Sequence, residues 1–454
     1  MKETKEIVAF LKERGFIYPG SDIYGGLANS WDYGPLGTIL KDNIKDSWKS
    51  FFVDQQENIF HLDSGIILNS QVWAASGHLG KFNDPMVDCK ECNSRFKADE
   101  LLENVEHIKT SKLSYEEMSL LIRKINCPVC NKSNWTNVRS FDLMFKMSNS
   151  KTGEAEEDVY LRPETAQGVF VNFKNIMDSF SPKIPFGIGQ IGKAFRNEVT
   201  PGNFIFRTKE FEQLELEFFC KEEETEKWFA FYLQKIHHYL EKDLKLKKEN
   251  IKEIDVPKDE LAHYSKKTYD FEYKFPFGWA ELLGLANRTD FDLKTHDKNS
   301  NEKLSYIDPL TKQNFYPHVI ETSMGVERLL FALINDHLVE EELEDKTIRL
   351  VLQLPYALAP YKAAIAPLTN KLDKEAHKLF SDLLQAKLGP IIYAKSGSIG
   401  KRYRKQDQIG TPFVITYDFD SEATNEVTIR HRDSMKQSRV QIKEIKKYII
   451  ENAI

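Results

Sequence analysis

The sequence predicts an α+β fold in which an antiparallel sheet is flanked by helices and followed by a smaller, separate mixed α/β domain. Two observations predict the sheet. Strand patterns run from residue 159 through residue 219, joined by hairpin-like loops, and a strand at 319–323 leads directly into an apolar helix at 324–335. The third observation predicts the smaller domain, because short strands and helices alternate after the acidic segment 340–345.

Length and composition set the expected domain organisation. A chain of 454 residues with 41% hydrophobic and 29% charged residues is typical of a soluble globular protein with two or three domains. We expect the main domain to combine residues 1–83 with 158–340, including a helical and irregular insertion at about 222–275. A polar insertion occupies 84–157, and the smaller domain occupies 345–454.

The elements follow in order from local patterns. Residues 1–83 combine a helix with turn-rich pieces, and residues 222–244 form a helix in which Trp228, Tyr232 and Ile236 recur at four-residue spacing. Residues 245–314 are lysine-rich and predict mostly irregular chain. In the smaller domain we expect strands at 348–354, 390–395, 412–418 and 426–431, and helices at 369–387, 398–408 and 438–452.

Composition also bears on the cellular compartment. No apolar run is long enough to span a bilayer, and the first residues mix acids with bases, unlike a secretory signal or a transit peptide. Four of the five cysteines form Cys-x-x-Cys pairs, which fits a reducing environment better than a disulfide framework. We therefore expect a cytoplasmic protein with no membrane partner.

The charge is unevenly distributed along the chain. The whole chain has a net charge of −6, whereas residues 345–454 hold 19 lysines and arginines against 12 acids, a net charge of +7. The preceding residues then have a net charge of −13. An acidic body with a basic C-terminal domain suits a polyanion that is held mainly at one end.

Residues 190–217 carry the strongest functional signal, because charge gathers on one face of two predicted strands. Side chains alternate along a strand, so Gln213, Glu215 and Glu217 share a face with Phe211, and Leu214 faces the other way. The leucine face can pack into a core. The carboxylates of the opposite face are costly to bury without a charged or hydrogen-bonding partner.

This segment resembles motif 2 of the class II aminoacyl-tRNA synthetases, Phe-Arg-x-Glu followed by a loop and Arg-x-x-x-Phe. In these enzymes an amino-acid carboxylate attacks the α-phosphate of ATP, and an arginine fork can hold both groups in line. The resemblance implies that Arg196 binds the α-phosphate and that Arg207 approaches the γ-phosphate. It also implies that Phe211 stacks on adenine, while Glu198 and the backbone near 206–208 read the adenine edge.

A second resemblance lies at 324–328, Met-Gly-Val-Glu-Arg, where a strand leads into a helix. A helix start offers unpaired N–H groups and favours phosphate. The segment resembles class II motif 3, Gly-x-x-Arg, so Arg328 is expected to cover the triphosphate or the outer face of adenine. The family usually has glycine two residues before Gly325. Here Ser323 takes that place, as in the glycine-specific members.

Residues 162–168, Arg-Pro-Glu-Thr-Ala-Gln-Gly, resemble the turn that these enzymes place beneath small amino acids. Glu164, Glu215 and Glu321 would then converge to pair the α-ammonium, and their bulk would exclude a side chain. With 31–37 and 95–99, these motifs resemble the homodimeric glycyl-tRNA synthetase family over about residues 6–445.

The family resemblance implies two sets of binding residues. The glycine-binding set is Arg95, Glu164, Phe211, Glu212, Gln213, Leu214, Glu215, Glu321, Thr322, Ser323, Met324 and Gly325. The ATP-binding set is Arg196, Asn197, Glu198, Phe206, Arg207, Thr208, Lys209, Glu210, Phe211, Glu281, Leu282, Arg288, Gly325, Val326, Glu327 and Arg328. Within these sets, Arg196 and Arg328 are the expected catalytic residues.

The cysteine pairs Cys89-x-x-Cys92 and Cys127-x-x-Cys130 form a four-thiolate set, the composition of a structural zinc site. Four thiolates leave no open position for a catalytic role. The 34-residue interval between the pairs exceeds the usual ribbon spacing, so free thiols stay the alternative. Cys220, beside two phenylalanines, is expected to be a buried core residue.

The C-terminal segment 396–404, Ser-Gly-Ser-Ile-Gly-Lys-Arg-Tyr-Arg, combines glycines, basic residues and an aromatic ring, a mixture suited to RNA loops. Together with 355–362 and 430–433, it resembles the anticodon-binding domain of the same family. A solvated basic helix start is the plainer interpretation of this segment taken alone.

The resemblance implies a glycine–tRNA ligase. Glycine and ATP, with magnesium, would give glycyl-adenylate, which then acylates the 3′-terminal ribose of glycine tRNA. It also implies a homodimer with residues around 31–50 at the interface. The alternatives are a related class II enzyme that charges serine, threonine or proline, and a catalytically silent RNA-binding paralogue.

Overall fold

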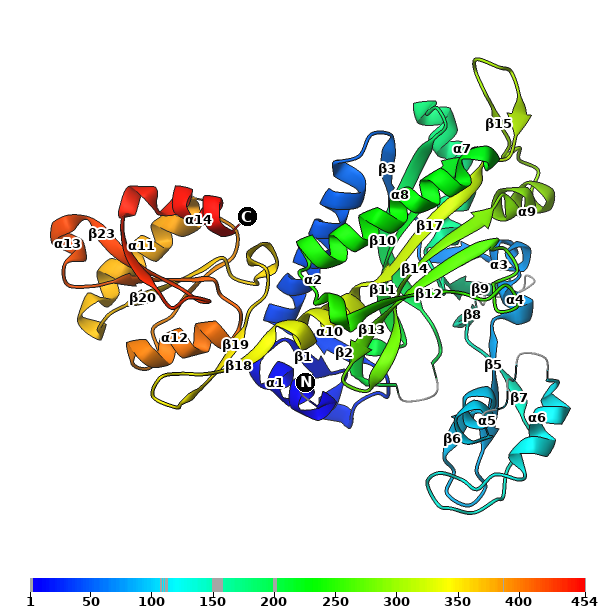
Figure 1. Cartoon of the computed structure of the whole chain (residues 1–454), viewed down its shortest axis with the longest axis horizontal. Coiled ribbons are helices and arrows are strands. Elements are labelled where there is room, and N and C mark those ends of the chain that lie inside the picture. The colour runs from blue at the N-terminus through cyan, green and yellow to red at the C-terminus, as the bar shows by residue number, and fades with distance from the viewer. Residues whose placement is uncertain are drawn as a thin grey trace.

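The computed structural model describes residues 3–106, 108, 110, 113–148, 158–198, 202–386 and 388–453. It shows a central body with two appended parts, and these lie at opposite ends in Figure 1. The part of the predicted insertion at 149–157 and Lys387 at the end of a predicted helix lie outside the described residues. Within the described ranges, no helix is both long enough and apolar enough to cross a bilayer.

The body is built on a seven-stranded sheet of order β12-β13-β14-β17-β11-β10-β3. All pairs are antiparallel except β10 with β3. The bounds are β3 Ile59–Leu62, β10 Phe186–Phe195, β11 Glu210–Cys220, β12 Ile251–Asp255, β13 Lys267–Phe275, β14 Gly278–Thr289 and β17 His318–Gly325. This confirms the predicted antiparallel sheet and the hairpin that carries residues 190–217 (Figure 1).

Helices cover both faces of this sheet. The leucine face of β11, with Leu214 and Leu216, packs into the main core together with residues of α2, α8 and α10. On the other face, α7 packs Phe170 and Phe173 against Phe219 and covers the far end of β11. The near end of that face is left open for a site. The helices of the body are α1 Thr4–Arg14, α2 Pro35–Lys49, α3 Ser70–Ala75, α4 His78–Lys81, α7 Ala166–Phe180, α8 Thr225–His238, α9 Phe291–Asn299 and α10 Val326–His337.

Small sheets complete the body. β4 and β8 flank β9, β1 pairs with β2, β15 with β16, and β18 with β19. Their bounds are β1 Ile17–Pro19, β2 Trp31–Tyr33, β4 Ile67–Asn69, β8 Lys146–Ser148, β9 Asp158–Leu161, β15 Tyr306–Ile307, β16 Asn314–Phe315, β18 Leu338–Glu342 and β19 Ile348–Leu352. Gly37 in the turn-rich N-terminal part has no room for a side chain, since an added Cβ would lie 1.9 Å from the Phe16 carbonyl oxygen.

The polar insertion folds around its own small core and a three-stranded sheet of order β6-β5-β7. Its elements are β5 Asn83–Asp88, β6 Arg95–Lys97, α5 Ala98–Glu106, α6 Tyr115–Ile122 and β7 Arg139–Asp142. The following strand β8 pairs with β9 of the body. The compact insertion therefore ends near residue 142, earlier than the predicted boundary at 157.

The C-terminal domain has a five-stranded mixed sheet of order β21-β20-β22-β23-β24. Its strands are β20 Ala363–Pro367, β21 Ile391–Tyr393, β22 Phe413–Tyr417, β23 Glu426–His431 and β24 Gln437–Gln441. Its helices are α11 Asp373–Gln385, α12 Ile399–Gln408, α13 Ser421–Thr424 and α14 Ile445–Ala453. The predicted helix at 438–452 is thus divided into a strand, β24, and the shorter helix α14.

The largest difference from the sequence prediction lies at 245–314, where mostly irregular chain is expected and the structure has β12, β13, β14, α9 and β15. The sequence does contain a strand pattern here, because aromatic residues alternate with polar ones along β13. Phe271, Tyr273 and Phe275 are fully buried in the main core. The high lysine content masked this period-two pattern.

Candidate active site

The polar face of β11 leads from an open cavity into the buried sheet. Phe211 and Gln213 line a cavity of about 400 Å³. Two residues further along the same face Glu215 is 2% exposed, and after two more Glu217 is 0% exposed. The predicted alternation is thus confirmed, and it arranges an aromatic ring, an amide and two carboxyl groups in order of increasing depth.

Most of the predicted ATP-binding side chains line this cavity: Arg196, Glu198, Phe206, Arg207, Thr208, Phe211, Glu281, Leu282, Gly325, Glu327 and Arg328. Gln213, Ser323 and Met324 of the predicted glycine set line it too. They come from β11, β14, β17, the start of α10 and the loop between β10 and β11. The structure therefore brings together segments that are more than 100 residues apart in the chain.

Other predicted residues lie outside the cavity lining. Leu214, Thr322 and Val326 are fully buried, and Leu214 and Val326 belong to the main core. Glu210 forms an ion pair with Lys193, and Glu212 forms ion pairs with Lys41 and Lys45. The Asn197 N–H bonds the Leu143 carbonyl, and the Lys209 carbonyl accepts a bond from the Arg196 N–H. Their predicted contacts with substrate stay predictions.

Arg196 follows β10 directly, and its side chain is held in the cavity by packing and one hydrogen bond. Nε donates to the Pro163 carbonyl at 3.0 Å, and the guanidinium lies 5.2 Å from the Phe82 ring centre and 5.3 Å from that of Phe211. No carboxylate among the described residues forms an ion pair with it. The free edge of the guanidinium is therefore available for an anion.

Arg328 lies in the first turn of α10. Its guanidinium stacks 4.4 Å from the Phe206 ring centre, and Nη1 lies 2.9 Å from the Glu281 carbonyl oxygen and 3.1 Å from the Glu281 carboxylate. The three residues come from three separate predicted ATP-binding segments. A cation stacked on an aromatic ring at the cavity edge can cover a flat base or approach a phosphate.

The insertion contributes a wall of the cavity that sequence reasoning missed. Asp84 on β5 and Lys97 on β6 line it and form an ion pair at 2.7 Å. Glu100 on α5 forms an ion pair at 3.1 Å with Arg207. The Arg-Phe-Lys-Ala-Asp motif at 95–99 pointed to this segment, but no pattern in the sequence says which of its residues meets the body.

Arg95, the residue that the resemblance assigned to substrate, lies elsewhere in this structure. Its Nε donates to Asp88 at 2.6 Å, within the insertion, and Arg95 is not part of the cavity lining. Side chains two residues apart on a strand share a face, so Lys97 lies on the same face of β6 as Arg95. Lys97 is the one of the two that lines the cavity. The predicted role of Arg95 stays a prediction.

Glu215 is held at the inner end of the cavity by neutral donors. Gln213 Nε2 and Ser323 Oγ donate to one carboxylate oxygen, each at 2.8 Å, and the Thr165 hydroxyl donates to the other. The Thr165 N–H in turn donates to Gln213 Oε1 at 3.1 Å, which fixes the amide. Among the described residues, no cation of the chain forms an ion pair with Glu215.

Glu321 is buried in the same layer, Glu164 lies half-buried near it, and each has a basic side chain as a partner. His78 Nε2 lies 3.3 Å from a Glu164 oxygen, and Arg288 Nη1 donates to Glu321 at 2.8 Å. Arg288 also binds Asp292 through Nε at 2.9 Å and Nη2 at 3.0 Å. Arg288 therefore stabilises the acidic layer from inside the protein, whereas the resemblance had placed it near the phosphates.

The environments of these carboxyl groups shift their pKa values in different directions. Burial raises the pKa of Glu215 to about 7, helped by the charges of Glu321 and Glu164. Burial also raises the pKa of Glu321, although Arg288 opposes it. For Glu164, burial acts upward but His78 and Arg288 outweigh it, so its pKa is lowered. Glu215, which has no ion-pair partner among the described residues, is therefore the carboxyl group whose ionised form a bound cation would stabilise most.

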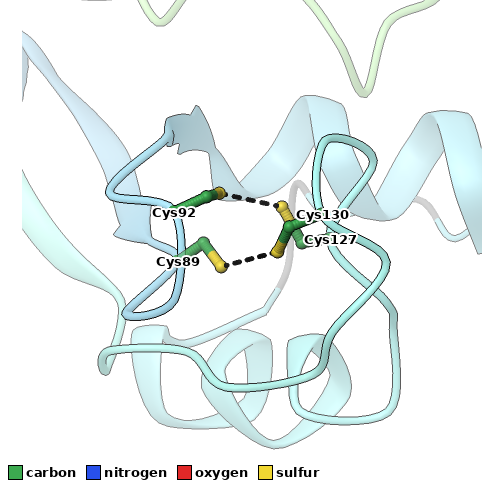
Figure 2. A group of neighbouring side chains, drawn as sticks. All are labelled: Cys89, Cys92, Cys127 and Cys130. Atoms are coloured by element: carbon green, nitrogen blue, oxygen red, sulfur yellow. Dashed lines mark hydrogen bonds between the residues drawn. The ribbon is translucent and has the colours of Figure 1, made fainter.

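The four paired cysteines of the insertion come together, as Figure 2 shows. Cys89 and Cys130 sulfurs are 3.6 Å apart, those of Cys92 and Cys127 are 3.7 Å apart, and all four lie within 4.8 Å of one another. Tetrahedral zinc with bonds of about 2.3 Å places its sulfurs about 3.8 Å apart. The donor set and its spacing therefore fit a structural zinc ion.

Comparisons with known proteins identify the family. Residues 145–337 match the family model "tRNA synthetase class II core domain (G, H, P, S and T)", and residues 362–452 match "Anticodon binding domain". The chain is 52% identical to the glycine–tRNA ligase of Caldanaerobacter subterraneus subsp. tengcongensis, covering 98% of this chain and 97% of the relative. It is 50% identical to that of Mesoplasma florum, covering 98% of this chain and 99% of the relative.

Among solved structures, the prolyl-tRNA synthetase of Cryptosporidium parvum matches with a TM-score of 0.62 at 12% identity, covering 98% of this chain and 74% of that chain. This likeness shows the fold alone. The curated relatives match at about half identity over nearly the whole length of both chains. The chain therefore belongs to the glycine–tRNA ligase family of the class II aminoacyl-tRNA synthetases.

Proposed function

We propose that this protein activates glycine with ATP to glycyl-adenylate and then transfers the glycyl group to the 3′-terminal ribose of glycine tRNA. The proposal rests on the fact that the cavity proposed for ATP and the acidic side chains proposed for glycine lie next to each other on the polar face of β11. The cavity lined by Arg196 and Arg328 reaches Ser323, whose hydroxyl donates to Glu215, and Glu321 is buried on the same face of the sheet. ATP and glycine could therefore meet at one point.

In the first step, the glycine carboxylate attacks the α-phosphate of ATP and pyrophosphate leaves. Arg196 is the residue that we assign to the α-phosphate, since its guanidinium is held at the cavity wall without a carboxylate partner in the described chain. Magnesium, when bound with ATP, neutralises charge on the phosphates. No side chain of the site is needed as a nucleophile, so the rate enhancement comes from alignment and charge stabilisation.

Specificity for glycine follows from charge and lack of space. The glycine ammonium would bind Glu215, which lacks a cation of its own, beside Ser323 and Glu321. Glycine offers no side chain to recognise, so larger amino acids must be rejected by exclusion. The side chains of Thr165 and Gln213, bonded to Glu215, fill the space next to the ammonium position.

We assign tRNA binding to the C-terminal domain, whose net charge is +7 over residues 345–454. Lys401 and Lys405 on α12 are exposed and could contact phosphates. Arg402 on the same helix is 4% exposed and donates to the Pro367 carbonyl, so it serves the fold instead. Arg430 likewise binds buried Asp407 at 2.8 Å.

A homodimer in the cytoplasm belongs to the same proposal. The predicted interface segment 31–50 mostly packs inside the chain, because Leu40, Ile44 and Trp48 of α2 are fully buried in the main core. The exposed apolar side chains precede it, with Ile23 at 88% and Tyr24 at 87% exposure. They support an interface slightly upstream of the predicted one.

Exchange of labelled pyrophosphate into ATP, measured separately with glycine, alanine and serine, tests the proposed function. We expect exchange that depends on glycine, with alanine and serine at least about 100-fold less effective in kcat/KM. Exchange with serine but not glycine would favour a related class II specificity. A chain that exchanges with none of the three would be a silent RNA-binding paralogue.

The four-cysteine site adds a second prediction, because the Cys-x-x-Cys of the β5–β6 hairpin connects the two strands that carry Asp84 and Lys97. We expect one zinc per chain by metal analysis. The variant Cys92→Ser is expected to lose the metal, unfold at lower temperature and raise the KM for ATP several-fold, since the cavity wall loosens.

The matched control is Cys220→Ala, which removes the buried cysteine outside the cluster. This variant is expected to retain the full zinc content. Metal-free protein with an unchanged melting temperature and an unchanged KM for ATP would show that the four cysteines are free thiols, the alternative interpretation of the sequence.

A further inference from the structure

Glu217 lies two residues deeper in the sheet than Glu215, and the reaction described above does not use it. It is 0% exposed, and neither carboxyl oxygen accepts a hydrogen bond from a donor group among the described residues. An ionised carboxylate in that position would be strongly unfavourable. A group of this kind needs a physical explanation.

Arg288, the arginine whose charge acts on Glu217, forms its hydrogen bonds with residues other than Glu217. Arg288 is bound to Asp292 by two hydrogen bonds and to Glu321 by a third. Glu217 forms no ion pair within the described part of the chain. Its carboxyl group therefore lies beside a cation whose charge is shared between two other carboxylates.

The strands around Glu217 place further acidic groups against it. Glu321 on β17 is directly opposite in the strand register, and Glu215 lies on the same face of β11. From β10 the side chain on the diagonal is Gln190, an uncharged amide that is also buried without hydrogen-bond partners in the described structure. The charged groups that act on Glu217 are Glu321 of β17, Arg288 of β14, Glu215 of β11 and Asp292 of α9.

These surroundings raise the pKa of both facing carboxyl groups, and they raise that of Glu217 more strongly. Burial, and next to it the charge of Glu321, hold the pKa of Glu217 well above its usual range. A hydrogen bond donated by a protonated Glu217 would act against this rise at Glu321 and lower the pKa of that group. The place of Glu217 opposite Glu321 and the stronger rise of its pKa favour one arrangement, in which the proton resides on Glu217 and the charge on Glu321.

We propose that Glu217 is a neutral carboxylic acid in the working enzyme and that it positions Glu321 by donating a hydrogen bond to it. Glu321 then stays ionised and oriented for the glycine ammonium. This inference rests on the proposed function, because it assigns Glu321 to the ammonium of glycine. A neutral Glu217 also removes a negative charge that would repel the glycine carboxylate on its way to the α-phosphate.

The test compares Glu217→Gln with Glu217→Leu in the full-length protein. Glutamine retains a neutral donor of the same shape, so the glycine KM is expected to stay within about 3-fold of the unmutated protein. Leucine removes the donor, so the glycine KM is expected to rise about 10-fold, and the acidic limb of its pH profile is expected to move to higher pH. The KM for ATP is expected to be unchanged in both variants.

An infrared difference spectrum between the unmutated protein and Glu217→Gln at neutral pH gives a readout that does not depend on activity. We expect the carbonyl band of a protonated carboxylic acid to be lost with the substitution. Loss of an ionised-carboxylate band instead would overturn the proposal. So would a glycine KM that rises equally in both variants, or a leucine variant that changes neither the KM nor the pH limb.

This design separates failure of the inference from failure of the proposed function. If the unmutated protein shows no glycine-dependent exchange, the proposed function is wrong whatever the infrared spectrum shows. If exchange is normal but the band belongs to an ionised group, Glu217 alone has been misassigned. The infrared arm also remains interpretable if the leucine variant fails to fold.

Discussion

Replacing Glu215 with glutamine is expected to raise the glycine KM about 100-fold or more while the KM for ATP changes less than about 3-fold. The carboxylate accepts bonds from Gln213 and Ser323 but has no cationic partner in the described chain. Its charge is therefore left to be matched by the glycine ammonium. Glutamine keeps the shape but removes that charge, so the buried ammonium would lose its partner.

The same carboxyl gives the reaction a pH dependence. Because burial raises the pKa of Glu215 to about 7, the free protein increasingly carries the protonated acid as the pH falls below 7. Ammonium binding needs the ionised form, so kcat/KM for glycine is expected to fall about tenfold per pH unit on the acid side. This limb is expected to disappear in Glu215→Gln, because the variant has no carboxyl at that position to titrate.

The effect of Glu215 on folding stability changes with pH in the opposite direction to that of an ordinary ion-paired carboxylate. The pKa of Glu215 is higher in the folded protein than in the unfolded chain. As the pH rises from the unfolded-state pKa to the folded-state pKa, the unfolded chain loses its proton first, so this group lowers the free energy of unfolding. Bound glycine relieves this cost by stabilising the charge. Glycine is therefore expected to raise the melting temperature of the unmutated protein and to leave that of Glu215→Gln unchanged.

Glu253→Gln is the matched control, because Glu253 lies on the edge strand β12 and bonds His237, away from the cavity. It is expected to leave both KM values unchanged. If Glu215→Gln raised the KM values for glycine and ATP equally, the assignment of Glu215 to the ammonium would be wrong.

The sequence was sufficient to predict which side chains of β11 share a face. Side chains alternate along a strand, so once Leu214 and Leu216 face the core, Glu215 must face the other side. Glu215 was identified by combining this face with two distant segments that the family resemblance brought together. The pairing of β11 with β17 places Glu215 opposite Ser323 in the sheet. Local pattern therefore predicted the strand and its polar face, while the roles that the family motif implies for the side chains stay predictions.

Contacts that depend on tertiary placement could not be predicted. Lys97 and Asp84 reach the cavity because the insertion packs against the body, and no period in the sequence encodes that packing. The partners of Arg288 on β14 are a second case, since Asp292 lies in the first turn of the following helix α9 but Glu321 comes from another strand. An arginine in a motif of this kind could bind phosphate or carboxylate, and in this structure Arg288 binds two carboxylates.

The second large effect is expected for Arg196. Substitution by alanine should lower kcat for glycine-dependent exchange about 1000-fold, in the range seen when a group that stabilises transition-state charge is removed. Nε is already occupied by the Pro163 carbonyl, and the rings of Phe82 and Phe211 hold the guanidinium plane. The side chain is therefore pre-oriented, which is what makes its loss so costly.

Arg196→Lys separates charge from geometry. Lysine retains the positive charge but cannot hold two oxygens in one plane while also bonding Pro163, so about a 100-fold loss of kcat is expected. Arg439→Ala is the control, since Arg439 pairs with Asp418 in the C-terminal domain and exchange needs no tRNA. It is expected to exchange normally.

The division of the loss between kcat and KM then decides what Arg196 does. A group that binds the α-phosphate more tightly as charge builds on it should lower kcat with little change in the KM for ATP. A group that merely holds the triphosphate would raise that KM and leave kcat intact. If both Arg196 variants showed the second behaviour, the α-phosphate assignment would have to move to another cation of the cavity, and Arg328 and Lys97 would be the residues to test.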